Sequence, residues 1–314
     1  MTAVKRKLAK SVAGSLWARG PAFRKELDSV PASEKKGVVT RYNGLDSAFG
    51  GLRGLNILGG LPGGLKTSFA LQLGVRALAD EETGVLMFSA EMRAARAMKM
   101  VCSLVSGVTR PQIERGALAD PKHLAALAEF DRFTDHEGRR FVIRDIEDDL
   151  STDALAQQAR EVGDELGVAK LLVIADSLQY LALRQPPTSH SSEKGRLDRL
   201  TAGLTEIADE GRICVLAVSH LPKSRAVRDA DVFQFLGSAG IDYCADATMT
   251  LEWERLPKSR KLGSRAPKVE TSECPVTLRV FKNRWGEPDL SFDFLATPGT
   301  GRFEEVAGEE DADD

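Results

Sequence analysis

A glycine-rich stretch at residues 58–68 limits the fold of this chain more than any other feature of its sequence. It follows an apolar, strand-like run that includes Leu55 and Ile57, and it leads into a helical run from Phe69 to Leu73. A strand, a glycine-rich turn, Lys-Thr and a helix are the layout of a phosphate-binding loop, in which backbone N–H groups and a helix N-terminus approach the phosphates. The sequence therefore predicts a nucleotide site formed by Gly60, Leu61, Pro62, Gly63, Gly64, Leu65, Lys66, Thr67 and Ser68.

The stretch departs from the usual phosphate-loop pattern at one position. The pattern is G-x-x-x-x-G-K-S/T, and aligning Gly60 with its first glycine puts Leu65 in place of the last. We expect Gly63 and Gly64 to supply the backbone freedom that a leucine lacks. In such a loop Lys66 reaches the β- and γ-phosphates and the Thr67 hydroxyl binds Mg²⁺. A plain glycine-rich turn that caps a helix is the alternative.

The composition is that of an ordinary globular protein, with 314 residues of which 42% are hydrophobic and 28% charged. No apolar run approaches the length of a membrane span, and the charged N-terminus lacks a signal sequence. We therefore expect a cytoplasmic protein without a membrane partner. The cysteines at 102, 214, 244 and 274 lie far apart without a C-x-x-C pair, which favours buried free thiols over a zinc site.

Charge is distributed unevenly along the chain although the net charge is only −3. The first 41 residues are rich in Lys and Arg, and the charged residues from Glu304 to Asp314 are all acidic. A basic arm and an acidic tail occur in many proteins that handle nucleic acids. Two solvated termini are an equally good interpretation, so charge alone gives no argument for DNA binding.

The chain is predicted to have three parts. Residues 1–37 form a basic helix and linker, with a break at Gly20-Pro21. Residues 38–303 alternate between strands and helices, which favours a mostly parallel sheet with helices on both faces. Residues 304–314 form an acidic, disordered tail. The expected central strands are 84–89, 141–144, 171–175 and 213–219, and later strands of hairpin character are 248–253, 276–282 and 290–294.

Several strands end in polar side chains, as strands of an open α/β sheet do at a ligand site. Two apolar runs end in the carboxylates Glu91 and Asp176, and a third ends in His220. We expect the strand that ends at Glu91 to lie beside the phosphate-loop strand. A nucleoside triphosphatase needs a carboxylate near Mg²⁺, a group that orients water and a polar sensor of the γ-phosphate. A later strand closes with Lys282 and Arg284, cations that can reach phosphates directly or across a subunit boundary. The alternatives are a helix cap, a helix-terminal charge, a structural histidine and a solvated hairpin end.

The order and the amino-acid sequences of these segments resemble those of the RecA-like ATPase domain of the DnaB family of hexameric replicative helicases. The resemblance covers roughly residues 40–303. RadA-type recombination ATPases, KaiC-like ATPases and RepA-like plasmid helicases are related families. The segments that carry the resemblance are Thr67-Ser-Phe-Ala-Leu71, Phe88-Ser-Ala-Glu-Met92, Gly107 to Gly116, Ala175-Asp-Ser-Leu-Gln179, Ser219-His-Leu-Pro-Lys223, Ala239 to Asp246 and Lys282-Asn-Arg-Trp-Gly286.

The resemblance implies a role for each candidate residue. Lys66 and Thr67 would bind phosphate and Mg²⁺, and Asp176 would support the metal through water. Glu91 would polarise the attacking water, and His220 would take the sensor position that the family usually fills with Gln. The cations Lys282 and Arg284 would complete a neighbouring subunit's site as an arginine-finger pair. The chain departs from the family at Leu65, at His220 and at Leu236-Gly237, where the family has Arg-Glu.

The sequence thus predicts an α/β fold of the RecA-like P-loop NTPase type with C-terminal β-hairpins, and ATP and Mg²⁺ as cofactors. We expect an ATP-hydrolysing motor: a ring-forming DNA helicase or translocase, a homo-oligomer of hexameric type, with single-stranded DNA and replication or recombination proteins as partners. One alternative is a RadA- or KaiC-like recombination or regulatory ATPase without unwinding activity. Another is an ATP-binding scaffold protein with slow hydrolysis, against which the joint presence of Lys66, Thr67, Glu91 and Asp176 argues.

Overall fold

The computed structural model describes residues 24, 37–116, 120–146, 151–186, 192–221, 239–253 and 273–306. The expected N-terminal helix and linker, apart from Arg24 and Gly37, lie outside these residues, and so does the tail from residue 307 onward. Most of the described residues belong to one compact unit, which begins at Gly37.

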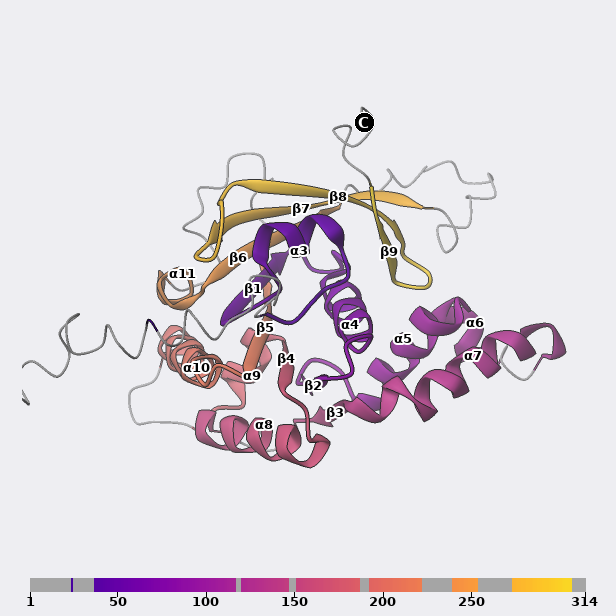
Figure 1. Ribbon diagram of the computed structural model, residues 1–314, viewed down its shortest axis with the longest axis horizontal. Helices are drawn as coiled ribbons and strands as arrows, with labels where there is room; N and C mark the ends of the chain where they lie inside the picture. The colour runs from indigo at the N-terminus through magenta and orange to yellow at the C-terminus, as the bar shows by residue number, and fades with distance from the viewer. Residues whose placement is uncertain are drawn as a thin grey trace, which may run out of the picture. The chain divides into compact units, whose positions relative to one another are not determined.

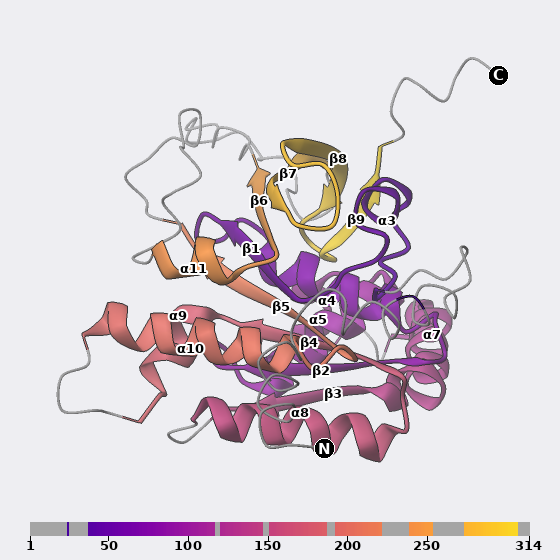
Figure 2. The same ribbon diagram turned by 60° about the vertical axis from the view of Figure 1, so that its left-hand side comes forward.

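The unit is built around one mixed sheet, in which the described residues contribute nine strands in the order β3-β2-β4-β5-β1-β6-β7-β8-β9. The first six in this order pair in parallel, and the remaining pairs are antiparallel. Figures 1 and 2 show the antiparallel strands in yellow at one end of the sheet. The expected parallel sheet with C-terminal hairpins is confirmed. The strands are β1 Leu55–Gly60, β2 Thr83–Ser89, β3 Phe141–Asp145, β4 Lys170–Asp176, β5 Ile213–His220, β6 Ala247–Trp253, β7 Cys274–Asn283, β8 Leu290–Thr297 and β9 Arg302–Glu305.

Helices cover both faces of the sheet because the central strands are apolar on both sides. Along β2, Val85 and Met87 belong to the cluster formed with α4 and α5, whereas Leu86 and Phe88 belong to the cluster formed with α8 and α10. In Figure 1, α4 and α5 lie to the right of the central strands, whereas α8 and α10 lie to the lower left. The helices are α3 Asn43–Phe49, α4 Lys66–Ala77, α5 Ala94–Ser106, α6 Arg110–Glu114, α7 Leu124–Asp135, α8 Thr152–Leu166, α9 Leu178–Leu183, α10 Glu193–Ala208 and α11 Ala239–Cys244, with 3₁₀ turns at Pro121–His123 and Glu137–Arg140.

The last described strand closes the unit onto its first helices. Gln72 of α4 donates a hydrogen bond to the Phe303 carbonyl over 2.8 Å and accepts one from the Phe303 N–H over 2.6 Å. The Tyr42 hydroxyl also donates to the Phe303 carbonyl, and the Glu305 carboxylate accepts from the N–H groups of Asn43 and Gly44 at the start of α3. We call these contacts the end clamp. We expected the acidic stretch to be disordered from residue 304. Its first two residues, Glu304 and Glu305, instead belong to β9, and Glu305 caps the start of α3.

In the part of the chain that the structure describes, no helix combines the length and the apolar character needed to cross a membrane. The cysteines are free thiols, of which Cys102, Cys214 and Cys274 are buried, as expected, while Cys244 is half-buried.

Candidate nucleotide site

The predicted phosphate loop joins β1 to α4 and has the expected compact shape. The Gly64 N–H donates to the Leu61 carbonyl over 2.9 Å, which closes a tight turn. Gly63 has a φ of 71°, and Leu65, the residue before α4, has a φ of 62° and a ψ of 9°. Our expectation that Gly63 and Gly64 would supply the flexibility was wrong in part, because Leu65 itself takes the left-handed conformation that favours glycine.

Lys66 lies folded over this loop at the first position of α4. Its Nζ donates to the carbonyls of Gly60 and Leu61, each over 2.9 Å, and the residue is only 4% exposed. Burial lowers the pKa of Lys66 to about 8, although Glu91 and Asp176 oppose this shift. A charged ammonium group that is desolvated among carbonyls is poised to exchange them for phosphate oxygens.

Thr67 and Asp176 are brought together beside this lysine. The Thr67 hydroxyl donates to Oδ2 of Asp176 over 3.0 Å. Asp176 ends β4, is fully buried, and its Oδ1 has no hydrogen-bond partner among the residues that the structure describes. Burial raises the pKa of Asp176 to about 6, and the hydrogen bond from Thr67 opposes this shift. The Thr67 hydroxyl and the Asp176 carboxylate, with its buried Oδ1, form a donor set that suits a hard cation that retains most of its waters.

Glu91 and His220 form a pair at the same edge of the sheet. Nε2 of His220 lies 3.1 Å from Oε2 of Glu91, and this hydrogen bond holds the pKa of Glu91 below its usual range, against the opposing effect of burial. His220 lies opposite Gly60 in the register of β5 and β1, so the pair borders the phosphate loop.

The route by which Glu91 reaches this place differs from our expectation. We expected Glu91 to end a strand next to the phosphate-loop strand, but β4 and β5 lie between β2 and β1. The segment after β2 instead folds over the end of β4, where the N–H groups of Ala90 and Glu91 donate to the Asp176 carbonyl over 2.8 and 3.3 Å. The backbone of one carboxylate residue thus positions the other.

Gln179 also lies at this edge, although it was not predicted as a site residue. Gln179, in the first turn of α9, donates from Nε2 to the Ser219 hydroxyl over 3.0 Å and accepts from the His220 N–H over 3.2 Å. Its side chain therefore ties the end of β4 to the end of β5. Its place three residues after Asp176, at the start of a helix, is the sequence signal that could have identified it.

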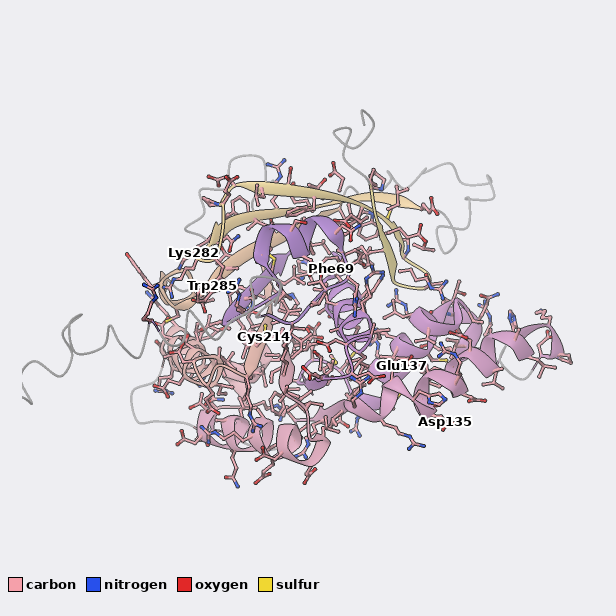
Figure 3. The ribbon with its side chains drawn as sticks, in the orientation of Figure 1. Phe69, Asp135, Glu137, Cys214, Lys282 and Trp285 are labelled. Atoms are coloured by element: carbon pink, nitrogen blue, oxygen red, sulfur yellow. The ribbon has the colours of Figure 1, made fainter. Side chains whose placement is uncertain are left out.

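Lys282 and Arg284 lie away from this edge of the sheet. Lys282 is opposite Thr248 near the start of β6, and the Arg284 N–H donates to the Asp246 carbonyl. Asp246 in turn pairs with Leu55 at the start of β1, so Arg284 lies near the beginning of the strand whose far end carries the phosphate loop. Thr248 is opposite Ile57, so Lys282 lies level with the middle of that strand. At about 3.3 Å per residue, β1 separates its two ends by about 17 Å. Figure 3 labels Lys282, near the end of β7, and Trp285, which follows Arg284 in the turn after this strand.

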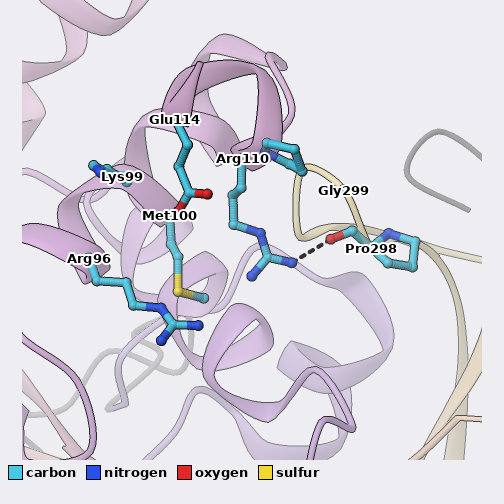
Figure 4. A pocket seen from close by; sticks show the side chains of 8 residues that line it. Arg96, Lys99, Met100, Arg110, Glu114, Pro298 and Gly299 are labelled. Carbon is cyan, nitrogen blue, oxygen red and sulfur yellow. Dashed lines mark hydrogen bonds between the residues drawn. The ribbon is translucent and has the colours of Figure 1, made fainter. Parts of the chain in front are cut away.

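A pocket of about 320 Å³ lies elsewhere, between α5, α6 and the turn from β8 to β9 (Figure 4). Arg110 extends into it and donates to the Pro298 carbonyl over 2.5 Å. No residue of the phosphate loop lines this pocket, so its position is separate from the chemistry described above. Its lining is Arg96, Lys99, Met100, Arg110, Pro111, Glu114, Pro298 and Gly299.

Comparisons with known proteins agree with this architecture. The chain is 26% identical over 190 residues to the protein named replicative DNA helicase DnaB of Haemophilus influenzae, which covers 60% of the chain and 39% of that protein. The same figures hold for the protein of that name from Pasteurella multocida. The chain therefore spans about two fifths of the length of these curated relatives.

Solved structures show the same fold. A DnaB-like replicative helicase, described with its interactions with primase, aligns with a TM-score of 0.74 and 18% identity over 91% of this chain and 65% of that one. A KaiC-like protein from Pyrococcus horikoshii aligns less closely, with a TM-score of 0.53 and 15% identity over 86% of this chain and 99% of that one. The family described as the DnaB-like helicase C-terminal domain matches residues 37–304. Since this match covers most of the chain, the protein belongs to the DnaB-like helicase C-terminal domain family.

Proposed function

We propose that this chain is the ATP-hydrolysing motor of a ring-shaped DNA helicase or translocase. The observation that carries the proposal is the convergence of Lys66, Thr67, Asp176, Glu91 and His220 at one edge of the sheet, from four different strand ends. In this proposal residues 38–303 are the ATPase domain, residues 1–37 a basic linker and residues 304–314 an acidic tail. The family match over residues 37–304 supports the boundaries.

The phosphate loop from Gly60 to Ser68 would bind the phosphates of ATP. The Lys66 ammonium group would exchange its hydrogen bonds to the carbonyls of Gly60 and Leu61 for hydrogen bonds to the β- and γ-phosphate oxygens. The negative charge of the phosphates favours this exchange. Thr67 would bind Mg²⁺ directly and Asp176 through water, and the unpartnered Oδ1 of Asp176 fits this arrangement. The ion, when bound, neutralises charge on the β- and γ-phosphates.

Glu91 would orient and polarise the attacking water. A base must be ionised and able to accept a proton, and the hydrogen bond from His220 lowers the pKa of Glu91 and keeps it ionised at neutral pH. His220 would sense the γ-phosphate, because it lies between Glu91 and the end of β1. A change at the γ-phosphate would then alter the hydrogen bond that His220 makes with Glu91.

Lys282 and Arg284 would act in the site of a neighbouring subunit. Along the strand direction, Arg284 is about 17 Å and Lys282 about 10 Å from the end of β1 that carries the phosphate loop of their own chain. A cation that completes a neighbour's site requires head-to-tail association, which closes into a ring when the rotation per subunit allows it. We therefore propose a homohexameric ring that encircles single-stranded DNA in the cytoplasm, with replication or recombination proteins as further partners.

The test combines activity with assembly. ATPase rate is measured with and without single-stranded DNA, and mass in solution is measured with ATP present. The proposal expects a hexamer whose turnover rises with DNA. A monomer, or an ATPase indifferent to DNA, would contradict the motor and favour a regulatory or recombination ATPase.

Two substitutions test the shared site. Glu91→Gln is expected to bind ATP but lose on the order of 100-fold or more in turnover, because the water-polarising group is gone. Arg284→Ala is expected to bind ATP and lose turnover as well. Mixing the two proteins should restore part of the activity, since an intact site forms at boundaries where each subunit supplies what the other lacks. Absence of any complementation would mean that each subunit works alone.

A further inference from the structure

Asp246 links Arg284 to the first residue of the phosphate-loop strand. One carboxylate oxygen, Oδ1, accepts from Nη1 of Arg284 over 2.9 Å. The other, Oδ2, accepts from the Leu55 N–H over 2.8 Å, and the backbone N–H of Asp246 donates to the Leu55 carbonyl over the same distance. The Asp246 side chain is 9% exposed and the Arg284 side chain 48% exposed, so a buried acceptor holds a half-exposed cation.

The contacts that Arg284 makes with the described residues use two of the N–H donors of its guanidinium group. Nη1 uses one N–H on Asp246, and Nη2 donates to the Tyr243 carbonyl at the end of α11 over 3.0 Å. A guanidinium group has five N–H donors in a fixed plane, so three remain for an outside acceptor. A side chain held in this way has already lost the rotamer freedom that an unsupported arginine would lose on binding phosphate.

The close approach of Asp246 to β1 depends on a glycine. Gly54 has a φ of +63°, and a Cβ added there would lie 2.0 Å from Oδ2 of Asp246. Only a residue without a side chain lets the carboxylate reach the Leu55 N–H at this point. From Leu55 the strand is fully buried as far as Gly60, whose carbonyl accepts from Lys66.

We propose that Asp246 is a positioning residue that holds Arg284 in place for the ATP site of the next subunit and anchors it to the strand that carries its own phosphate loop. The inference rests on the role of Arg284 given in the proposed function. It adds a physical connection between successive sites: the arginine offered to one nucleotide and the loop that binds another are joined by one buried strand.

The first test is Asp246→Asn, which keeps the size of the side chain but replaces one acceptor with a donor. The asparagine amide can accept from Arg284 or from Leu55 but not from both. Turnover should fall on the order of 10- to 100-fold with KM nearly unchanged, because the misplaced group acts only in the reaction step. Binding of a fluorescent ATP analogue should stay within about twofold, since the phosphate loop is intact.

The matched control is Glu252→Gln. Glu252 also lies on β6 and forms a cross-strand ion pair, 3.2 Å from Arg279 of β7, at the other end of the same strand pair. Its substitution should leave turnover unchanged. A loss as large as that of Asp246→Asn would mean that any ion pair between these strands supports activity, and the positioning role would be rejected.

Mixed oligomers separate positioning of Arg284 from general damage. Asp246→Asn mixed with Glu91→Gln should regain activity, because one supplies Glu91 and the other a well-held Arg284. Asp246→Asn mixed with Arg284→Ala should not, because both defects lie in the same half of the site. Regained activity in the second mixture would overturn the inference.

The outcomes also distinguish this inference from the proposed function. If Arg284→Ala is inactive while Asp246→Asn turns over like the wild type, the proposed function stands and the inference fails. If Arg284→Ala turns over normally, the proposed role of Arg284 itself is wrong. Should Asp246→Asn not fold, Gly54→Ala replaces it, since its methyl group displaces the carboxylate without removing charge. Normal turnover of that variant, or failure of both variants to fold, rejects the positioning role.

Discussion

Leu65 gives the sharpest prediction about the phosphate loop, because it occupies a conformation that favours glycine. Its φ of 62° and ψ of 9° place it in the left-handed region directly before α4. Its side chain is partly buried against the core cluster that includes Phe69. Two substitutions separate these features: Leu65→Gly removes both the strain and the side chain, whereas Leu65→Ala removes the side chain and keeps the strain.

The expected difference in the free energy of unfolding follows from three contributions. The left-handed conformation costs a residue with a Cβ roughly 1–2 kcal/mol. Losing a partly buried leucine side chain costs about 1 kcal/mol in either variant, and the glycine loses a further 0.5–1 kcal/mol, roughly, through the freedom of the unfolded chain. Leu65→Gly should thus lie near the wild type, and it should be more stable than Leu65→Ala by up to about 1.5 kcal/mol.

Urea unfolding of the three proteins measures this order. At an ordinary helical position alanine is the more stable of the two by about 1 kcal/mol, so the reversed order identifies the left-handed conformation. If Leu65→Ala is the more stable variant, the conformation assigned to Leu65 is wrong. Nucleotide affinity should stay within a few-fold in Leu65→Gly because the loop shape is unchanged. A large gain would show that the native loop binds poorly and would favour an ATP-binding scaffold with slow hydrolysis.

Two further predictions concern pH and the N-terminal segment. Burial lowers the pKa of Lys66 to about 8, and phosphate favours the charged form of this lysine. ATP affinity should therefore be highest below that pH and fall about tenfold between pH 7 and pH 9. Titration calorimetry should detect proton uptake on binding, and Lys66→Arg, which stays charged, should remove the pH dependence; an affinity independent of pH in the wild type would contradict the shift. Deleting residues 1–36 should weaken oligomerisation and lower ATPase activity while the core stays folded, because the compact unit begins at Gly37. A truncated monomer that hydrolyses ATP at the full rate would show that the segment has no role in assembly.

Sequence reasoning located most of the candidate site because its residues end short apolar strands. It could not give the order of those strands, which depends on how each helix crosses over the sheet, so Glu91 was expected next to β1 although β4 and β5 intervene. The strand β9 was missed because only Phe303 among its residues faces the core, and its partner Gln72 is far away in the sequence.

The backbone conformation of Leu65 and the contact between Asp246 and Arg284 could not be predicted from the sequence either. Nothing in a leucine predicts a positive φ, and only the departure of Leu65 from the glycine of the pattern pointed to an unusual position. Asp246 and Arg284 both lie in segments that resemble the family, yet their contact spans 38 residues and becomes visible only when β6 and β7 pair.

The end clamp has a consequence for the time at which this domain folds during its synthesis on the ribosome. The start of α3 is capped by Glu305, and Gln72 of α4 finds both of its backbone partners on Phe303. A nascent chain that has emerged only as far as Gly301 thus contains the whole phosphate loop but lacks the groups that fix the helix behind it. Contacts of such sequence separation form slowly. We therefore expect the loop to reach its final geometry, and to bind nucleotide, late in synthesis, when the C-terminal strands have joined the sheet.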